Sequence, residues 1–218
     1  MNASSRNLVL VVAALVFFSG LSCGLFQKSQ PRGEDPLPLA KGATWKYRAT
    51  VTAYNTESQR VESKSFDWTT KVIEERYGTG VIGYVVSGWP TDIDGQSGAA
   101  TPSQTMILRA GEFYLFAGGT VSKDEPTLDG AERWFRVPLF DSDSVCPDDG
   151  AWSDGVLYCW VVAKDGANKH RYRITFRSGP DDMTYILEAG RGLVGYHYEH
   201  HGTTNTVDLT LVSYTPGA

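Results

Sequence analysis

The sequence is poor in the residues that characterise nucleic-acid-binding, metal-binding and multi-span membrane proteins. Its 20 Lys and Arg are outnumbered by 25 Asp and Glu, so the formal net charge is −5, whereas phosphate backbones are bound mainly by basic side chains. Only three cysteines occur, without the CxxC or Cys/His spacing of zinc sites. One apolar run, Leu8–Phe18, stands out, which excludes several membrane spans. We therefore expect no nucleic-acid partner and no cofactor.

The apolar run has the layout of a secretory signal. Arg6 precedes Leu8–Phe18, and small residues follow up to Cys23, as in a positively charged segment, a short hydrophobic segment and a cleavage site. Ser22 and Gly20 before Cys23 resemble the lipobox of bacterial lipoproteins. The resemblance implies that residues 1–22 are removed, that Cys23 carries fatty acyl chains including palmitate, and that the mature protein is anchored in the outer membrane.

An uncleaved membrane anchor is the alternative interpretation of this segment. No charged residue occurs from Asn7 to Gln27, and such a stretch is just long enough to span a bilayer. Both interpretations place the rest of the chain in the cell envelope, outside the cytoplasm and tethered to a membrane at its N-terminus.

The mature chain is expected to consist of a tether and one domain. Residues 23–37 are polar and proline-containing without apolar periodicity, which is typical of a flexible linker. From Thr44 onward, apolar residues alternate with polar ones, beginning with Trp45, Tyr47 and Ala49. This period of two predicts strands, and residues 38–218 are assigned to a single β-rich domain.

About ten such segments follow one another, separated by turns rich in Gly, Asp and Pro. Asp182–Glu188 is the only short stretch with a helical pattern. Sequential short strands with local turns predict an antiparallel meander. The expected fold class is therefore mainly β, with little helix, and the sheet forms a barrel, a half-barrel or a curved sheet; a sandwich is the other arrangement that fits. The segments Trp89–Ser103, Gly118–Gly130 and Leu139–Gly155 are predicted to be long loops at one rim.

Both ends of this domain carry motifs that resemble those of exported β-rich bacterial proteins without an established activity. The opening motif is Pro38-Leu39-x-x-Gly42-x-x-Trp45-x-Tyr47, and the closing motif runs from Gly190 through Tyr198-x-His200-His201-Gly202. The resemblance implies a single exported domain and assigns no function.

The remaining two cysteines are expected to pair. Cys146 and Cys159 flank a loop rich in Asp and Gly, and an exported chain with a lipidated Cys23 would otherwise carry two free thiols. Two reduced, buried cysteines are the alternative.

The segment His197-Tyr198-Glu199-His200-His201 is the best candidate for chemistry. On a strand, His197, Glu199 and His201 share one face, and residues two apart can converge on one metal ion whose open position activates water. Three such positions span roughly 13 Å, so one ion would require the strand to bend. A metal-dependent hydrolase using these residues and His200 is one functional hypothesis; solvated or packed histidines are the alternative.

Two tryptophans lie in predicted loops instead of strands. Trp89 and Trp152 stand beside Pro90 and Ser153, where indole rings could stack on a sugar or could cap a barrel end. They support a carbohydrate-binding hypothesis. Because no catalytic motif is present, the leading hypothesis is a non-enzymatic, lipid-anchored envelope protein that binds a hydrophobic ligand or an envelope partner.

Overall fold

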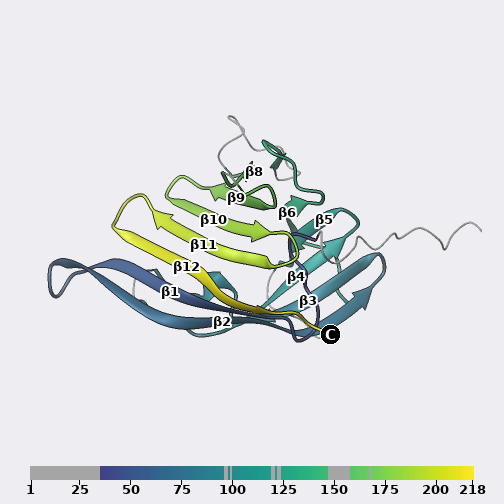
Figure 1. Ribbon diagram of the computed structural model, residues 1–218, viewed down its shortest axis with the longest axis horizontal. Helices are drawn as coiled ribbons and strands as arrows, with labels where there is room; N and C mark the ends of the chain where they lie inside the picture. The colour runs from purple at the N-terminus through teal and green to yellow at the C-terminus, as the bar shows by residue number, and fades with distance from the viewer. Residues whose placement is uncertain are drawn as a thin grey trace, which may run out of the picture. The chain divides into compact units, whose positions relative to one another are not determined.

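The computed structural model describes residues 35–95, 98, 100–118, 121, 124–146, 158–166 and 168–218. Residues 1–22, Cys23 and Trp152 lie outside this part of the chain. Within it, twelve strands and one short 3-10 helix occur (Figure 1). The strands are β1 (Thr44–Asn55), β2 (Arg60–Gly78), β3 (Val81–Ser87), β4 (Gln104–Ala110), β5 (Phe113–Phe116), β6 (Glu132–Arg136), β7 (Ser144–Val145), β8 (Trp160–Lys164), β9 (Arg171–Arg177), β10 (Asp181–Glu188), β11 (Gly192–His200) and β12 (Asn205–Thr215), and the 3-10 helix is η1 (Pro90–Asp92).

Alternating burial explains why these segments are strands. In β1, Trp45, Tyr47 and Ala49 are buried, whereas Lys46 and Arg48 between them are exposed. Successive side chains of a strand point to opposite faces of the sheet, so the apolar set of β1 lies on the inner face. The prediction of a mainly β, antiparallel fold with little helix is confirmed.

The helical candidate Asp182–Glu188 was wrong. These residues belong to β10, where Tyr185 and Leu187 are buried at positions two apart. A short apolar stretch fits both periods, and pairing with β9 and β11 on either side selects the extended conformation.

Neighbouring strands in the sheet are neighbours along the chain, with one exception. The order is β6-β5-β4-β3-β2-β1-β12-β11-β10-β9-β8-β7, so the chain winds from the middle of the sheet to one edge and returns from the opposite edge. The exception is the pairing of β1 with β12, the first and last strands. The twelve strands curve into a nearly closed barrel whose open seam lies between β6 and β7.

In the described sheet no ladder joins β6 to β7, and side-chain contacts bridge this seam instead. Arg136 of β6 contacts Asp143 through both its Nε and Nη2 atoms, at 2.7 and 2.8 Å, and Trp160 of β8 donates its indole N–H to Glu132 at 3.2 Å. Next to β7, a disulfide joins Cys146 and Cys159. The contacts of Arg136 and Trp160 hold the two edges of the sheet together, and the disulfide closes the connection between β7 and β8 on one of those edges.

Aromatic rings fill the middle of the barrel. The indole of Trp134 is fully buried and lies 4.7 Å from the Phe116 ring, 4.9 Å from the Tyr185 ring and 5.7 Å from the Trp89 ring, measured between centroids. Trp160 and Tyr196 extend the same cluster. Aromatic pairs at such separations stabilise beyond the area they bury, and here they join strands of both halves of the chain.

No helix in the described residues is long and apolar enough to cross a membrane.

The side chain of Leu187 is expected to contribute to stability as a core residue, because it is fully buried in β10. Leu187→Ala should lower the free energy of unfolding by about 2–5 kcal/mol. Leu128→Ala, a matched substitution at a half-exposed position, should change it by less than about 0.5 kcal/mol. Urea unfolding of the full chain measures both, and equal losses would contradict the assignment of Leu187 to the core.

Candidate functional site

One end of the barrel is covered by the N-terminal part of the domain. Residues Asp35–Ala43, which we call the strap, run into β1, and Leu37 in the strap is 1% exposed. The Gly190 N–H between β10 and β11 donates to the Asp35 carbonyl at 2.9 Å. Asp35 and Leu37 therefore already pack on the domain, although the sequence assigns both to the flexible tether. We call this end of the barrel the strap end.

A half-buried carboxylate fixes the beginning of the strap. Asp35 accepts hydrogen bonds from the Tyr114 hydroxyl and the Leu37 N–H, each at 2.9 Å. Burial raises the pKa of the Asp35 carboxyl, and the two hydrogen bonds and the nearby charge of Arg109 oppose that rise. The strap thus forms a packed cover that polar contacts anchor to the strap end.

The opposite end, which we call the loop end, carries the longest connections. The segments that join β3 to β4, β5 to β6 and β7 to β8 all leave the sheet there, as do the short turns after β9 and β11. This distribution follows from the meander, because alternate connections of an up-and-down sheet lie at the same end. These connections thus leave from a single end of the barrel, opposite the strap.

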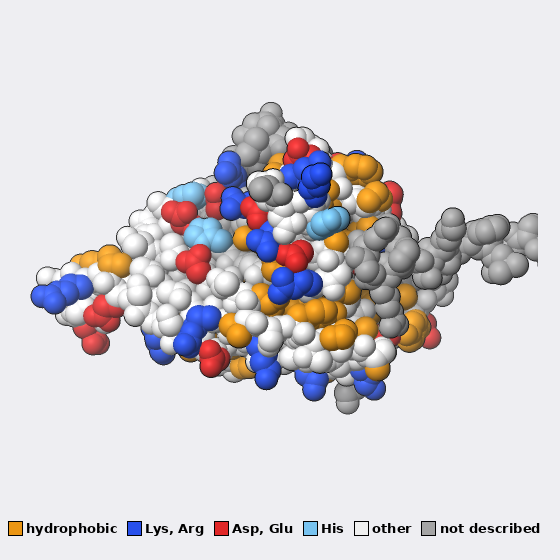
Figure 2. Space-filling view, in the orientation of Figure 1, with side chains coloured by type: hydrophobic (Ala, Val, Ile, Leu, Met, Phe, Trp, Pro, Cys, Tyr) orange, Lys and Arg blue, Asp and Glu red, His pale blue; other side chains and the backbone are white. Residues whose placement is uncertain are grey.

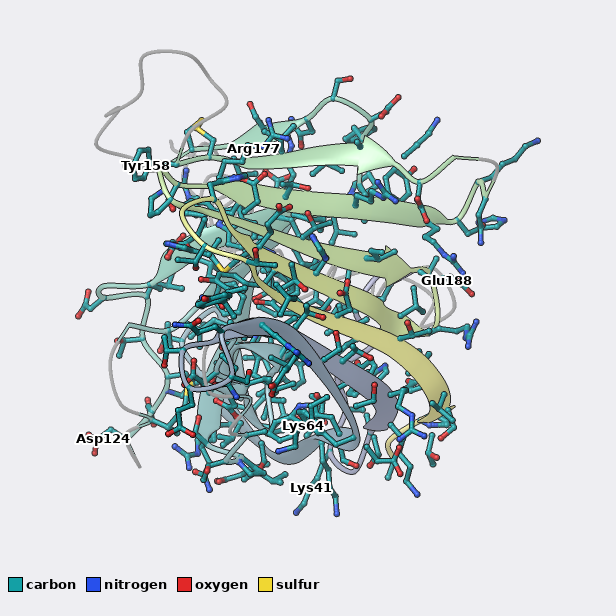
Figure 3. All side chains as sticks on the ribbon, turned by 90° about the vertical axis from the view of Figure 1, so that its left-hand side faces the viewer. Lys41, Lys64, Asp124, Tyr158, Arg177 and Glu188 are labelled. Atoms are coloured by element: carbon teal, nitrogen blue, oxygen red, sulfur yellow. A yellow bond between two sulfur atoms is a disulfide. The ribbon has the colours of Figure 1, made fainter. Side chains whose placement is uncertain are left out.

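The inner side of the barrel is occupied by the chain's own residues. The connection from β3 to β4 turns inward, so that Trp89 is 2% exposed and donates its indole N–H to the Tyr185 hydroxyl at 3.4 Å. Further along, Gly95 packs against Tyr198 and Val207. Figure 3 views the barrel from the loop end and shows side chains filling its concave side.

Of the two interpretations of Trp89, burial of its ring excludes stacking on a sugar and favours the alternative, in which the ring caps the barrel. A ring that is packed between Phe116, Trp134 and Tyr185 has no free face for a ligand. The other tryptophan of that hypothesis, Trp152, lies outside the described residues.

The histidine segment occupies β11 and its turn, near the loop end. His197 points outward and its Nδ1 lies 2.7 Å from Asp208 of β12, while Glu199 lies 3.7 Å from its Nε2. His200 lies on the other face, with Nδ1 at 2.8 Å from Asp181 of β10. His201, after the end of the strand, is 3.3 Å from Asp182.

These pairings disperse the residues that the metal hypothesis requires. His197 and Glu199 share a face, but His200 points to the opposite one, and His201 has left the strand. Among the residues that the structure describes, no group of three or more His, Cys, Asp or Glu side chains is arranged to hold a metal ion. The alternation of a strand is the physical reason, since adjacent residues cannot face one ion.

The hairpin of β1 and β2 forms a second feature of the loop end, which we call the arm. At the left of Figure 1, it extends beyond the neighbouring strands, because β12 pairs with β1 only as far as Thr52. Basic, acidic and apolar side chains lie side by side at its tip (Figure 2). Tyr54 and Val61 form an exposed cross-strand pair on the outer face.

An open pocket of about 400 Å³ lies on the inner face of the arm. Its lining is largely polar and includes Asn55, Glu57, Glu62 and Lys64. The Glu62 carboxylate accepts hydrogen bonds from Ser58 and Asn55, and these lower its pKa. The sequence did not indicate the first part of β2, since Arg60–Ser65 is exposed throughout and alternation is visible only where the two faces differ.

The chain matches no protein-family model and no curated protein sequence. Among solved structures, it is similar to a provisionally named exported protein with a YmcC-like fold from Bacteroides fragilis, with 7% identity, a TM-score of 0.38 and coverage of 82% of this chain and 98% of the other. A provisionally named lipoprotein from Parabacteroides distasonis is similar at 12% identity and a TM-score of 0.37, with coverage of 84% and 99%. TM-scores this low do not establish a common fold, and neither description is extended to this chain.

The pairing of His197 with Asp208 is expected to make stability depend on pH. The hydrogen bond with Asp208, together with the charge of Glu199, raises the pKa of His197 above its ordinary value of 6.5. The charged pair therefore stabilises the folded state below about pH 6.5, and this contribution is lost as the pH rises through the raised value. In Asp208→Asn, the His197 pKa measured by NMR titration should fall. Asp67→Asn, an exposed change on β2, serves as the control; an unchanged His197 pKa in Asp208→Asn would contradict the assignment.

Proposed function

We propose that this chain is a lipid-anchored protein of the bacterial cell envelope, without catalytic activity of its own, that binds another envelope protein through its loop end. The signal segment and Cys23 support the anchor. The opposite placement of the strap and the long connections carries the binding proposal.

The two ends of the barrel differ in what they offer to a partner. The chain that leads from Cys23 reaches the domain at Asp35, on the strap end, where Leu37 and Tyr114 are buried. The loop end lies at the other end of the strands and presents the arm and the turns after β9 and β11, whereas the connection from β5 to β6 folds back so that Pro126 packs against Gly78 and Gly83. Binding residues are commonly found on loops that a rigid scaffold positions, so the loop end is the favoured surface.

The packing of the inner side favours a protein partner over a hydrophobic ligand. Ligand pockets for small apolar molecules are concave and lined mainly by apolar side chains. Here Trp89, Trp134 and Tyr185 pack against one another on the inner side, and the pocket beside the arm is lined largely by polar groups. A surface contact needs no such cavity.

Site-specific photo-crosslinking in producing cells tests the proposed surface. A photoreactive phenylalanine analogue replaces Tyr158, which is 44% exposed just before β8 at the loop end, or Tyr77, which is 66% exposed at the strap end of β2. We expect a discrete protein adduct from position 158 and none from position 77.

Adducts from position 77 alone would contradict the loop-end proposal. A fatty-acyl or phospholipid adduct from position 158, or stoichiometric lipid in native mass spectra of the purified chain, would instead support the hydrophobic-ligand hypothesis.

The anchor is tested through Cys23. Metabolic labelling with an alkyne fatty acid should mark the wild-type chain, and Cys23→Ser should abolish the label and release the domain from the membrane fraction, because the acyl chains provide the attachment. Cys146→Ser should keep the label, since Cys146 lies in the domain and forms a disulfide with Cys159. A mature chain that retains residues 1–22 and carries no label would favour the uncleaved anchor.

A further inference from the structure

The arm contains a strand edge that has no neighbour. β2 pairs with β1 along Arg60–Lys71 but with β3 only from Lys71 onward. Gly88 lies beside the next part of the edge, where its carbonyl accepts hydrogen bonds from the side chains of Trp68 and Thr70. In the part of the chain that the structure describes, no strand pairs with the outer edge of Arg60–Asp67. Such an edge presents unpaired N–H and C=O groups to any extended chain that approaches it.

The charges along this edge follow a regular pattern. Arg60, Glu62 and Lys64 lie on the inner face, whereas Val61 and Ser63 lie on the outer face. Lys64, labelled in Figure 3, belongs to the pocket lining together with Glu62. The inner face of the edge thus carries positive, negative and positive charges at successive positions.

This pattern is complementary to itself in one register. Two copies that pair antiparallel about a two-fold axis keep their inner faces on the same side of the joined sheet. With the axis at Ser63, Glu62 of each copy lies opposite Lys64 of the other. With the axis at Lys64, two lysines lie opposite each other, and with the axis at Glu62, two glutamates do.

We propose that a second copy of this chain binds along Arg60–Phe66 of β2, antiparallel and with the two-fold axis at Ser63. The main-chain groups of both edges then form a shared ladder, as in strand addition to a sheet edge. Two Glu62–Lys64 pairs flank the axis on the inner face.

The length and position of the arm suit this arrangement. The arm extends past the neighbouring strands in Figure 1, so an antiparallel second arm meets β2 before it meets the rest of the barrel. The inference does not rest on the lipid anchor or on binding of another envelope protein, because it needs only the edge of β2 and its charges.

Charge reversal on the full chain in detergent micelles tests the register. Sedimentation velocity is expected to show a concentration-dependent dimer of the wild type. E62K places two lysines opposite each other on both sides of the axis, and K64E places two acids opposite each other in the same way. Each variant should raise the dimer dissociation constant about tenfold or more, since like charges directly opposite destabilise strand pairing.

The double variant E62K/K64E restores opposite charges and should return the dissociation constant to near the wild-type value. K46E reverses an exposed lysine of β1 that lies away from this edge and should leave the constant unchanged. Rescue by the double variant also separates pairing from any local effect of losing the Asn55 and Ser58 contacts of Glu62.

Thiol crosslinking locates the axis. Ser63→Cys should link two copies efficiently with a short thiol reagent, because opposite Cβ atoms lie about 4.5–5.5 Å apart. Ser65→Cys, on the same face, should not, since the two positions 65 are then separated by about 13 Å. A wild-type chain that stays monomeric at all concentrations, a dimer that survives both single reversals, or equal linking at positions 63 and 65 would overturn the proposal.

Discussion

The pairing of β1 with β12 is the constraint on which the rest of the structure depends. Every other ladder joins strands that are adjacent in the chain, and each half of the domain could form its own local meander. Within the described sheet, only the β1–β12 ladder, which runs from Thr44 to Thr52 of β1, joins the two halves by strand pairing. It also brings the aromatic rings of the first half against those of the second, such as Trp134 against Tyr185.

Because the barrel is filled by its own side chains, recognition of other molecules is left to its outer surface. Once Trp89 and its neighbours occupy the inner side, what remains for recognition is the set of exposed surfaces at the two ends and along the arm. The strap uses one of these ends for structure, through the half-buried Asp35 and the buried Leu37. Besides the seam between β6 and β7, the unpaired edge of β2 is where this barrel departs from a closed, uniformly hydrogen-bonded one.

The sequence predicted those parts of the fold where the two faces of a strand differ. Trp45, Tyr47 and Ala49 alternate with polar and charged residues, and the structure buries them as expected. Arg60–Ser65 shows no alternation because both of its faces are exposed, and the short apolar stretch Asp182–Glu188 is compatible with the periods of both a helix and a strand. In both segments, pairing with neighbouring strands determines the extended conformation.

The candidate site was less predictable than the fold, for a related reason. His197 and His200 lie three positions apart in β11 and therefore face opposite sides of the sheet. Their partners, Asp208 and Asp181, come from two different strands. Register between strands sets these partnerships, and it is not visible in one sequence. The sequence leaves both interpretations of Trp89 open, because a loop that folds into a barrel cannot be distinguished from an exposed loop by composition.

The route by which the strap enters the sheet also has a mechanical consequence. The strap continues directly into β1, which is bonded along its whole length to β2 on one side and as far as Thr52 to β12 on the other. A pull from the N-terminus acts along the axis of β1, so the ladders on both sides resist it in shear, with many hydrogen bonds sharing the load. In a domain held by its N-terminus, force is therefore applied through β1, a strand with a hydrogen-bonded neighbour on each side.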